Sequence, residues 1–383
     1  MNNKLFKIVD ASTLKGADAP SRARKAIRRG DVIYATVRPT LKRVAYVSEQ
    51  YHEQVCSTGY CVLRTDETLD SRFLYFWLLT DDISKQVEGM QRGASYPAIR
   101  DSDVKKLPIL IPPLSEQRCI AAVLSLLQQA IEEQERLIEL TTELKKALMH
   151  KLFTEGTRGE PQKQTEIGHI PESWEVICLG DVIDVAQYGL SVRADDRGTY
   201  PMLRMTNQVD GKIVSADLKY VNLGDDDLAK FRVIPGDILF NRTNSFDLVG
   251  RTAIFDLDGD YVFASYLIRL RMNRERLNPF FLNHYFNCDT TQVRLKSIAT
   301  RAVSQSNISA TRLKGFEVPV PLLNEQTEIV KNCDLLDVKR SHHQQLRDSL
   351  DSLFRTLLHQ LMTAEIRVND IDLSELEAEG TPS

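Results

Sequence analysis

The pattern of apolar and polar positions repeats once along the chain, at a distance of about 209 residues. Residues 106–117 read Lys-Leu-Pro-Ile-Leu-Ile-Pro-Pro-Leu-Ser-Glu-Gln, and residues 315–326 read Gly-Phe-Glu-Val-Pro-Val-Pro-Leu-Leu-Asn-Glu-Gln. In both copies an apolar run typical of a β-strand is followed by prolines and then by a Glu-Gln pair that opens a helical pattern. Two copies at so long a period indicate a duplicated unit and not a solenoid of short repeats.

After each copy, the chain continues with the periodicity of a long amphipathic helix. Apolar residues recur at steps of three and four, at Ile120, Leu124, Leu127, Ile131, Ile138, Leu144, Leu148 and Leu152 in the first segment, and at Ile329, Cys333, Leu336, Leu346, Leu350, Leu353, Leu357 and Leu361 in the second. Ser115 and Asn324 are the expected N-caps, because their side chains can accept hydrogen bonds from the first turn. Charged residues such as Glu132, Lys145 and Arg347 predict a solvated opposite face. About 38 residues at about 1.5 Å each predict helices of roughly 57 Å.

The apolar stripe of each helix needs a partner. An isolated amphipathic helix is only marginally stable in water, and the nearest match for its stripe is the stripe of the other helix. We therefore predict an α+β fold in which two mixed α/β domains are separated by a pair of long antiparallel coiled-coil helices. The alternative is that each amphipathic helix lies separately on its own domain.

The segments that precede the helices share further landmarks. Each copy contains a Gly-Asp turn with a following strand, and then a second strand, at 30–34 and 43–47 in the first copy and at 236–240 and 251–255 in the second. Asp70 and Asn278 come later and predict helix N-caps, and Pro279 suits the first helical position. The two domains are therefore expected to share a core and to differ in their loops.

Composition and charge exclude several classes of protein. With 383 residues, of which 42% are apolar, the chain can bury two cores of ordinary domain size. The six cysteines show no CxxC spacing, which favours reduced thiols over a disulfide framework. Apolar runs long enough to cross a membrane are missing from the sequence, and we expect a cytoplasmic protein with no membrane partner. The net charge of −4 is unfavourable for a nonspecific nucleic-acid binder.

The sequence offers little for catalysis. Residues 278–281 (Asn-Pro-Phe-Phe) are similar to the Asn/Asp-Pro-Pro-Tyr/Phe loop of adenine methyltransferases, but the second proline is missing and no glycine-rich turn precedes them. They are better interpreted as a helix cap. The phosphate-binding loop, the HExxH motif and the GxSxG motif are all missing. His342 and His343 follow Cys333 on a helical segment, but in a polar stretch that does not favour a metal site. We expect no catalytic, cofactor-binding or metal-binding residues.

Taken together, these features resemble the specificity subunits of type I restriction-modification systems. The resemblance depends on the paired Gly-Asp strands, the paired Glu-Gln helix starts, the two long helices and residues 167–174 (Ile-Gly-His-Ile-Pro-Glu-Ser-Trp), and it covers nearly the whole chain. It implies two target-recognition domains, each reading one half of an asymmetric bipartite site in double-stranded DNA. It also implies partners: two methyltransferase subunits, and restriction/translocase subunits. S-adenosylmethionine, ATP and Mg would then belong to those partners, with no cofactor in this chain.

The resemblance sets the expected domain limits. These are 1–113 for the first target-recognition domain, 114–157 for the first spacer helix, 158–321 for the second target-recognition domain, 322–365 for the second spacer helix and 366–383 for an acidic tail. One part is unmatched, because residues 166–206 of the second copy have no counterpart before Lys7-Ile8-Val9, which is similar to Lys212-Ile213-Val214. Either the first domain is abbreviated at its N-terminus or the given sequence begins late.

Candidate DNA contacts come from loops that carry arginine and amide side chains. Arginine can bond guanine with two hydrogen bonds, and asparagine or glutamine can do the same with adenine. The candidate residues are Arg38, Lys42, Arg43, Arg92, Tyr96, Arg204, Asn207, Arg242, Asn244, Ser245, Arg251, Arg301 and Gln305. The alternative for any single arginine is an ordinary solvated surface charge.

Two other functions stay open at this point. One is a non-catalytic coiled-coil scaffold whose duplicated domains bind protein, which the net charge of −4 mildly favours. The basic loops at equivalent positions favour DNA instead. The other is a self-contained adenine methyltransferase, which would have to bind S-adenosylmethionine by itself.

Overall fold

The structure is a computed structural model that describes residues 6–9, 11–93, 95–301 and 305–368. It divides into two compact units. Unit 1 comprises Met1–Ile138 with His342–Ser383, and unit 2 comprises Glu139–Ser341. Most of the expected acidic tail, from residue 369 onward, lies outside the described residues. No helix in the described part of the chain is both long and apolar enough to cross a lipid bilayer.

Unit 2 is built on a six-stranded sheet with the order β11-β12-β16-β14-β18-β9. The strands are β9 (Ile183–Tyr188), β11 (Gln208–Val209), β12 (Lys212–Ile213), β14 (Ile238–Asn241), β16 (Thr252–Ile254) and β18 (Leu267–Met272). All neighbours are antiparallel except β12 and β16. Strand β14 is buried on both faces: Ile238 and Phe240 join one core with helix α6 (Pro279–Asn287), while Leu239 joins a second core that contains Phe263. Successive side chains of a strand point to opposite faces, so one strand serves both cores.

Smaller elements complete unit 2. The sheets are β13-β10-β17 (Lys219–Val221, Tyr200–Leu203, Val262–Phe263), β21-β8 (Glu317–Val320, Glu175–Cys178), β6-β7 (Gln162–Thr165, Gly168–Pro171) and β15-β20-β19 (Thr243–Asn244, Ser306–Asn307, Thr300–Arg301). The helices are α5 (Asp225–Phe231), α7 (Asp289–Ser297) and α8 (Ala310–Lys314), with 3-10 turns at Leu179–Asp181 and Met205–Asn207. Trp174 is fully buried and its ring lies 6.4 Å from that of Phe281 on α6.

Unit 1 has a smaller version of this core. Its sheets are β3-β2-β5 (Val44–Tyr46, Val32–Ala35, Tyr60–Leu63) and β1-β4 (Ala23–Ala26, Val55–Ser57). Its helices are α1 (Ser71–Trp77), α2 (Asp81–Met90) and α3 (Asp101–Val104), with 3-10 turns at Gly16–Asp18, Pro39–Leu41 and Glu49–Tyr51.

The predicted caps of α1 and α6 are confirmed, because the Asp70 side chain accepts from Arg72 N and Phe73 N, and the Asn278 side chain accepts from Phe280 N. Local turn chemistry therefore determines where α1 and α6 begin.

A buried aspartate explains why both copies keep the Gly-Asp turn. Asp31 and Asp237 are 1% and 0% exposed, and each carboxylate accepts two hydrogen bonds from one arginine, Arg64 and Arg271 respectively, at 2.7–2.8 Å. Each also accepts a backbone N–H from three residues earlier in the chain. The aspartate thus holds the turn that starts the central strand, and it raises the pKa of its arginine partner by hydrogen bonding.

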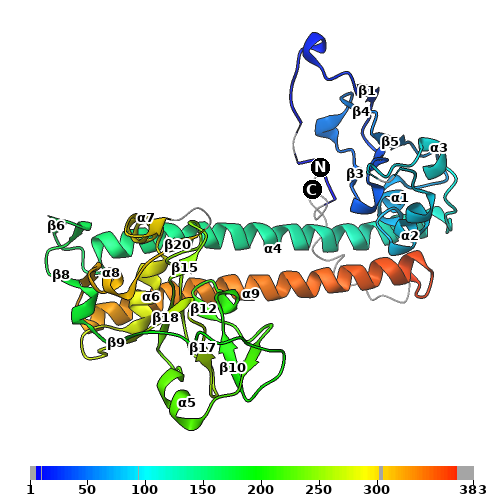
Figure 1. Cartoon of the computed structure of the whole chain (residues 1–383). Coiled ribbons are helices and arrows are strands. Elements are labelled where there is room, and N and C mark those ends of the chain that lie inside the picture. Colours follow the sequence, from blue (N-terminus) through cyan, green and yellow to red (C-terminus); the bar gives the residue numbers. More distant parts are fainter. Residues whose placement is uncertain (1–5, 10, 94, 302–304, 369–383) are drawn as a thin grey trace. The chain divides into compact units, whose positions relative to one another are not determined.

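The two long helices are present, but their first residues lie before the positions that the predicted N-caps imply. Helix α4 covers Leu114–Glu155 and helix α9 covers Leu323–Met362 (Figure 1). Ser115 and Asn324 therefore lie inside the first turn, and the prediction that they are the N-caps is wrong. The physical reason is that the start of each helix does not depend on a capping side chain at Ser115 or Asn324. A residue two positions further along the first turn makes the hydrogen bonds that hold the start of the helix in place.

That residue is a buried glutamine, Gln117 in α4 and Gln326 in α9, both 0% exposed. The Gln117 amide accepts from the backbone N–H of Asp70 at 2.7 Å and donates to Pro112 O at 2.9 Å. Gln326 repeats this arrangement with the backbone N–H of Asn278 and with Pro321 O, at 2.7 and 2.8 Å. Each glutamine therefore ties the start of its long helix to the N-cap of α1 or α6.

The glutamate before each glutamine also has a repeated contact. Glu325 lies 3.4 Å from the guanidinium of Arg158, which follows α4, and Glu116 lies 2.8 Å from that of Arg367, which follows α9. Helix α4 ends at Glu155, and the next residue, Gly156, has a φ of +66°, a left-handed conformation that favours glycine. A Cβ there would lie 2.6 Å from Glu325 Oε1, so this glycine also permits the close approach of Glu325.

Within each unit, the two long helices contribute to the same hydrophobic core. In unit 1, Leu124 of α4 and Leu358 of α9 share a core, and Gln134 lies 2.8 Å from His343 Nδ1. In unit 2, Met149 of α4 and Ile329 of α9 share a core. Lys145, expected on the solvated face, is instead only 18% exposed and contacts both carboxylate oxygens of Asp337 at 2.6 Å. The periodicity of the sequence thus did not indicate that Lys145 is partly buried in an ion pair with Asp337.

One predicted strand is missing. Residues 317–320 form β21, but the matching apolar run at 106–112 is not a strand. Strand β21 pairs with β8, which belongs to the segment that the first copy lacks, and no counterpart of β8 is present among the described residues of unit 1. Leu110 and Ile111 are accordingly 68% and 55% exposed. An apolar run forms a strand only where another strand can bond it.

All six cysteines are free thiols, as expected. Burial raises the pKa of Cys61 to about 11 and that of Cys333 to about 12, whereas Cys119 and Cys178 are exposed. Because the thiolate is the reactive form, iodoacetamide at pH 8 should modify Cys119 and Cys178 in the folded protein, and Cys61 and Cys333 only after denaturation. Peptide mass spectrometry measures this, and rapid modification of Cys333 in the folded protein would contradict its burial.

Candidate nucleic-acid interface

In unit 2, the structure brings two of the predicted contact loops together. The first loop, residues 242–249, follows the buried strand β14, and the second loop consists of Thr300, Arg301 and 305–307. Thr243 pairs with Asn307 and Asn244 with Ser306, and Ser306 also pairs with Arg301. Arg242, Asn244, Ser245, Arg301 and Gln305 are therefore presented by one small sheet.

Unit 1 joins its equivalent loops in the same way. Its first loop, residues 36–43, follows the buried strand β2, and its second loop consists of 92–93 and 95–99. β-bridges connect Val37 with Ala98 and Arg92 with Ala98, and Arg38 N donates to Pro97 O at 2.7 Å. Both units thus place the pair of loops at the end of the central strand, where a rigid core fixes their position. Binding residues are commonly held on loops in this way.

Aromatic rings lie against three of the predicted arginines. The guanidinium carbon of Arg38 is 5.2 Å from the centre of the Tyr96 ring, that of Arg242 is 4.6 Å from Tyr188, and that of Arg301 is 3.9 Å from Phe246. These are cation–π distances. Sequence reasoning missed Tyr188 and Phe246. Phe246 could have been noticed in the sequence, because it is an aromatic residue inside an otherwise polar loop. Tyr188 is the last residue of β9, and no feature of the sequence placed it near Arg242.

Some predicted contact residues are held by internal bonds. Lys42 Nζ lies 2.6 Å from Asp81, and Arg43 donates to Val37 O at 3.0 Å. Arg204 contacts Asp217 through its guanidinium, and Asn207 is fully buried, with its amide bonded to Val214 O and Ala216 O. These four residues shape the neighbouring turns and loops.

The remaining predicted residues are more open. Arg92, Tyr96, Ser245, Arg251, Arg301 and Gln305 are exposed, and Asn244 is half-buried. Tyr96 is 71% exposed, so most of this aromatic side chain is accessible to solvent. Arg251 follows the first loop closely in sequence and lines a cavity of about 980 Å³ that Lys212 and His284 also line. The exposed side chains are those that can reach a ligand without rearrangement.

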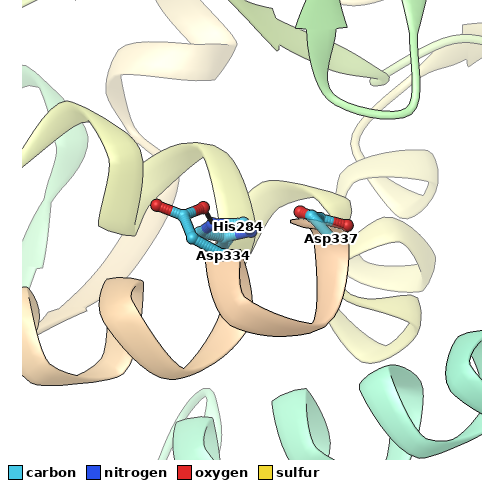
Figure 2. A group of neighbouring side chains, drawn as sticks. All are labelled: His284, Asp334 and Asp337. Carbon is cyan, nitrogen blue, oxygen red and sulfur yellow. Dashed lines mark hydrogen bonds and ion pairs between the residues drawn. The ribbon is translucent and has the colours of Figure 1, made fainter. Parts of the chain in front are cut away.

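The same cavity contains a cluster with ligand types for a metal. His284 Nε2 of α6 lies 2.9 Å from Asp334 Oδ1 of α9, and Asp337 follows one turn later (Figure 2). The bond from His284 lowers the pKa of Asp334. Asp337 is already neutralised by Lys145 at 2.6 Å and approached by Arg340 at 3.7 Å. Lys145 and Arg340 both pair with Asp337, whose side chain is only 4% exposed, so this is an ion-pair network around one buried carboxylate, and a divalent cation would have to displace Lys145.

Comparisons with known proteins agree with the duplicated architecture. A family model described as the type I restriction modification DNA specificity domain matches residues 2–142 and 171–351. The chain is 38% identical over 172 residues to the type I restriction enzyme MjaX specificity subunit of Methanocaldococcus jannaschii, which is 44% of this chain but only 40% of that relative. It is 26% identical over 319 residues to the MjaVIII specificity subunit of the same organism, covering 80% of this chain and 73% of that protein.

A solved structure shows a similar arrangement. It concerns the structural basis underlying complex assembly and conformational transition of the type I R-M system. The alignment covers 94% of this chain and 89% of the solved chain, with 27% identity and a TM-score of 0.58. The family model covers far more than half of the sequence, in two segments that contain the two sets of paired loops. The chain therefore belongs to the family of type I restriction modification DNA specificity domains.

Proposed function

We propose that this chain is the DNA-sequence-specificity subunit of a type I restriction-modification complex, with each unit reading one half of an asymmetric bipartite target in double-stranded DNA. The observation that carries the proposal is the repeated pair of loops. In both units, arginines stand on two loops that are joined by β-sheet pairing at the end of a buried strand, and Arg38, Arg92 and Arg301 among them are exposed. Two similar frames with different loop sequences suit two different half-sites.

The proposal includes the long helices. We infer that α4 and α9 pair as an antiparallel coiled coil that separates two target-recognition domains. Contacts inside each unit support this, because Gln134 bonds His343 in unit 1 and Lys145 bonds Asp337 in unit 2, so residues later in α4 meet residues earlier in α9. The domain limits at 114–157 and 322–365 are part of the same proposal.

The chemistry is assigned to partners. Relatives are named specificity subunits of restriction enzymes, and we propose that this chain docks methyltransferase subunits, two per complex, together with restriction/translocase subunits in the cytoplasm. S-adenosylmethionine, ATP and Mg would be bound by those subunits. The chain itself would have no active site.

The function is tested by expressing the chain with its methyltransferase subunit and mapping N6-methyladenine in the host DNA. We expect one bipartite motif with a fixed spacer. A purified complex should then bind that motif in a gel shift more tightly than a scrambled duplex, at several salt concentrations, because phosphate contacts weaken with salt while base contacts keep the preference. Methylation without a motif would contradict the proposal and favour a protein-binding scaffold.

Replacement of Arg242 and Asn244 by alanine should lower affinity for the methylated motif more than for random duplex. Arg242 stands on Tyr188 and Asn244 pairs with Ser306, so both side chains are placed by the frame of unit 2. Loss of one good base contact corresponds to about 1–3 kcal/mol of discrimination. The matched control is Arg38→Ala in unit 1, which should weaken recognition of the other half-site. Equal losses on motif and random duplex would show that the loop contacts only the DNA backbone.

A further inference from the structure

We propose that a cation–π pair between the two loops of each unit positions one arginine to read a guanine. In unit 2, Arg301 reads a G·C pair of the half-site. In unit 1, Arg38 reads a G·C pair of the other half-site. Phe246 and Tyr96 are the positioning residues. This inference rests on the proposed function and names the base for which each stacked arginine is suited.

The geometry is clearest in unit 2. The guanidinium carbon of Arg301, on the second loop, lies 3.9 Å from the centre of the Phe246 ring, on the first loop. Lys296 Nζ lies 5.8 Å from the same ring. Arg301 is exposed, and its guanidinium makes no hydrogen bond or ion pair with any residue in the described part of the chain. The Phe246 ring fixes the plane of the guanidinium, while no described residue uses the guanidinium's N–H donors, which are arranged to bond a planar ligand.

Unit 1 has the same pair with the roles exchanged. There the first loop supplies the cation, Arg38, and the second loop supplies the ring, Tyr96, at 5.2 Å. The Arg38 side chain is exposed, and its backbone is in the left-handed conformation with a φ of 49°. Arg38 directly follows Val37, which forms the β-bridge between the loops. The two contacts are not inherited from one ancestral pair, because the residue types are swapped between the loops. Their recurrence between equivalent loops therefore indicates a shared requirement for a stacked arginine.

The other arginines of these loops are less suited to base reading. Arg242 also lies on a ring but donates to Ser265 O at 3.3 Å, and Arg92 lies 3.8 Å from Asp103. A guanidinium held flat, with its fork free, matches the O6 and N7 acceptors of guanine in the major groove, which is the commonest specific contact of arginine. A lysine at the same place would keep the charge but lose the fork.

The test uses the full chain in complex with its methyltransferase subunit and a duplex library with randomised positions. Wild type should select a motif with a guanine in the half-site of unit 2. Arg301→Lys should lose that preference by about 5- to 150-fold while retaining affinity for random duplex. Phe246→Ala should reduce the same preference, and Phe246→Leu, which fills the space without a π face, should resemble Phe246→Ala.

The matched control is Arg232→Lys, whose arginine pairs with Asp260 at 2.8 Å elsewhere in unit 2 and should leave the motif unchanged. A duplex with 7-deazaguanine at the selected position should bind wild type as weakly as it binds Arg301→Lys, because N7 is removed. If Arg301→Lys keeps the guanine preference, or if the half-site of unit 2 contains no G·C pair, the inference is overturned and the proposed function stands. If wild type selects no motif at all, the proposed function itself fails.

Discussion

Replacement of Asp237 by alanine should destabilise unit 2 by about 3–5 kcal/mol, the cost of breaking a buried ion pair by removing one partner. The carboxylate is fully buried and accepts from two nitrogens of Arg271 and from Ile234 N. Without it, the guanidinium of Arg271, whose side chain is 31% exposed, loses its counter-charge, and a backbone donor at the start of β14 is left unpaired.

The measurement can be restricted to one unit, because the chain has two tryptophans, Trp77 in unit 1 and Trp174 in unit 2. In a Trp77→Phe background, urea unfolding followed by the fluorescence of Trp174 reports on unit 2. The matched variant Asp31→Ala, followed by Trp77 in a Trp174→Phe background, should cost less, about 1–3 kcal/mol, since Arg64 is 52% exposed and regains water. Equal losses in both units would show that exposure of the arginine does not determine the cost.

The parts of this fold that local chemistry determines could be predicted from sequence. The Gly-Asp turns before β2 and β14, the caps Asp70 and Asn278, and the long periodic helices each depend on residues within a few positions of one another. The repeat also identifies residues 166–206 as the part of the second copy that has no counterpart in the given sequence of the first.

What could not be predicted depends on partners that are distant in sequence. The start of each long helix is fixed by Gln117 or Gln326, which reach the caps of α1 and α6 nearly fifty residues away. The run at 106–112 has the composition of a strand, but no strand to pair with in the described chain. For the candidate DNA interface, the arginines could be named from their loops, whereas the rings of Phe246 and Tyr188 against them could not.

The buried ion-pair network of unit 2 provides the second large effect. Replacement of Asp337 by alanine should destabilise unit 2 by about 3–5 kcal/mol, because Lys145, only 18% exposed, would keep its charge without the carboxylate that it contacts at 2.6 Å. The same urea unfolding, followed by Trp174, measures this loss. Smaller losses are expected if Lys145 can extend into the adjoining cavity and regain water.

The repeat offers a matched rescue for that variant. Aligned through Gln117 and Gln326, and through Asp70 and Asn278, the positions of Lys145, His284, Asp334 and Asp337 correspond to Phe354, Phe76, Ser125 and Gln128 of unit 1. There Phe76 and Phe354 are buried, with their rings 6.1 Å apart in an edge-to-face contact. The same scaffold therefore accepts an apolar pair at the place where unit 2 keeps charges.

We expect that transfer of the unit 1 residues into unit 2 restores most of the stability that Asp337→Ala loses. The fourfold variant is Lys145→Phe, His284→Phe, Asp334→Ser and Asp337→Gln. The reason is that apolar groups of suitable volume commonly replace a buried ion pair at no net cost.

The dependence of stability on acid pH gives an independent readout. Hydrogen bonding to His284 lowers the pKa of Asp334 below its ordinary 3.8, so its contribution is present above that pH and is lost as the pH falls through the lowered value. The fourfold variant should lack this acid-dependent loss. If it is instead as unstable as Asp337→Ala at neutral pH, the charges are required by the packing of unit 2, and the equivalence of the two cores ends at this position.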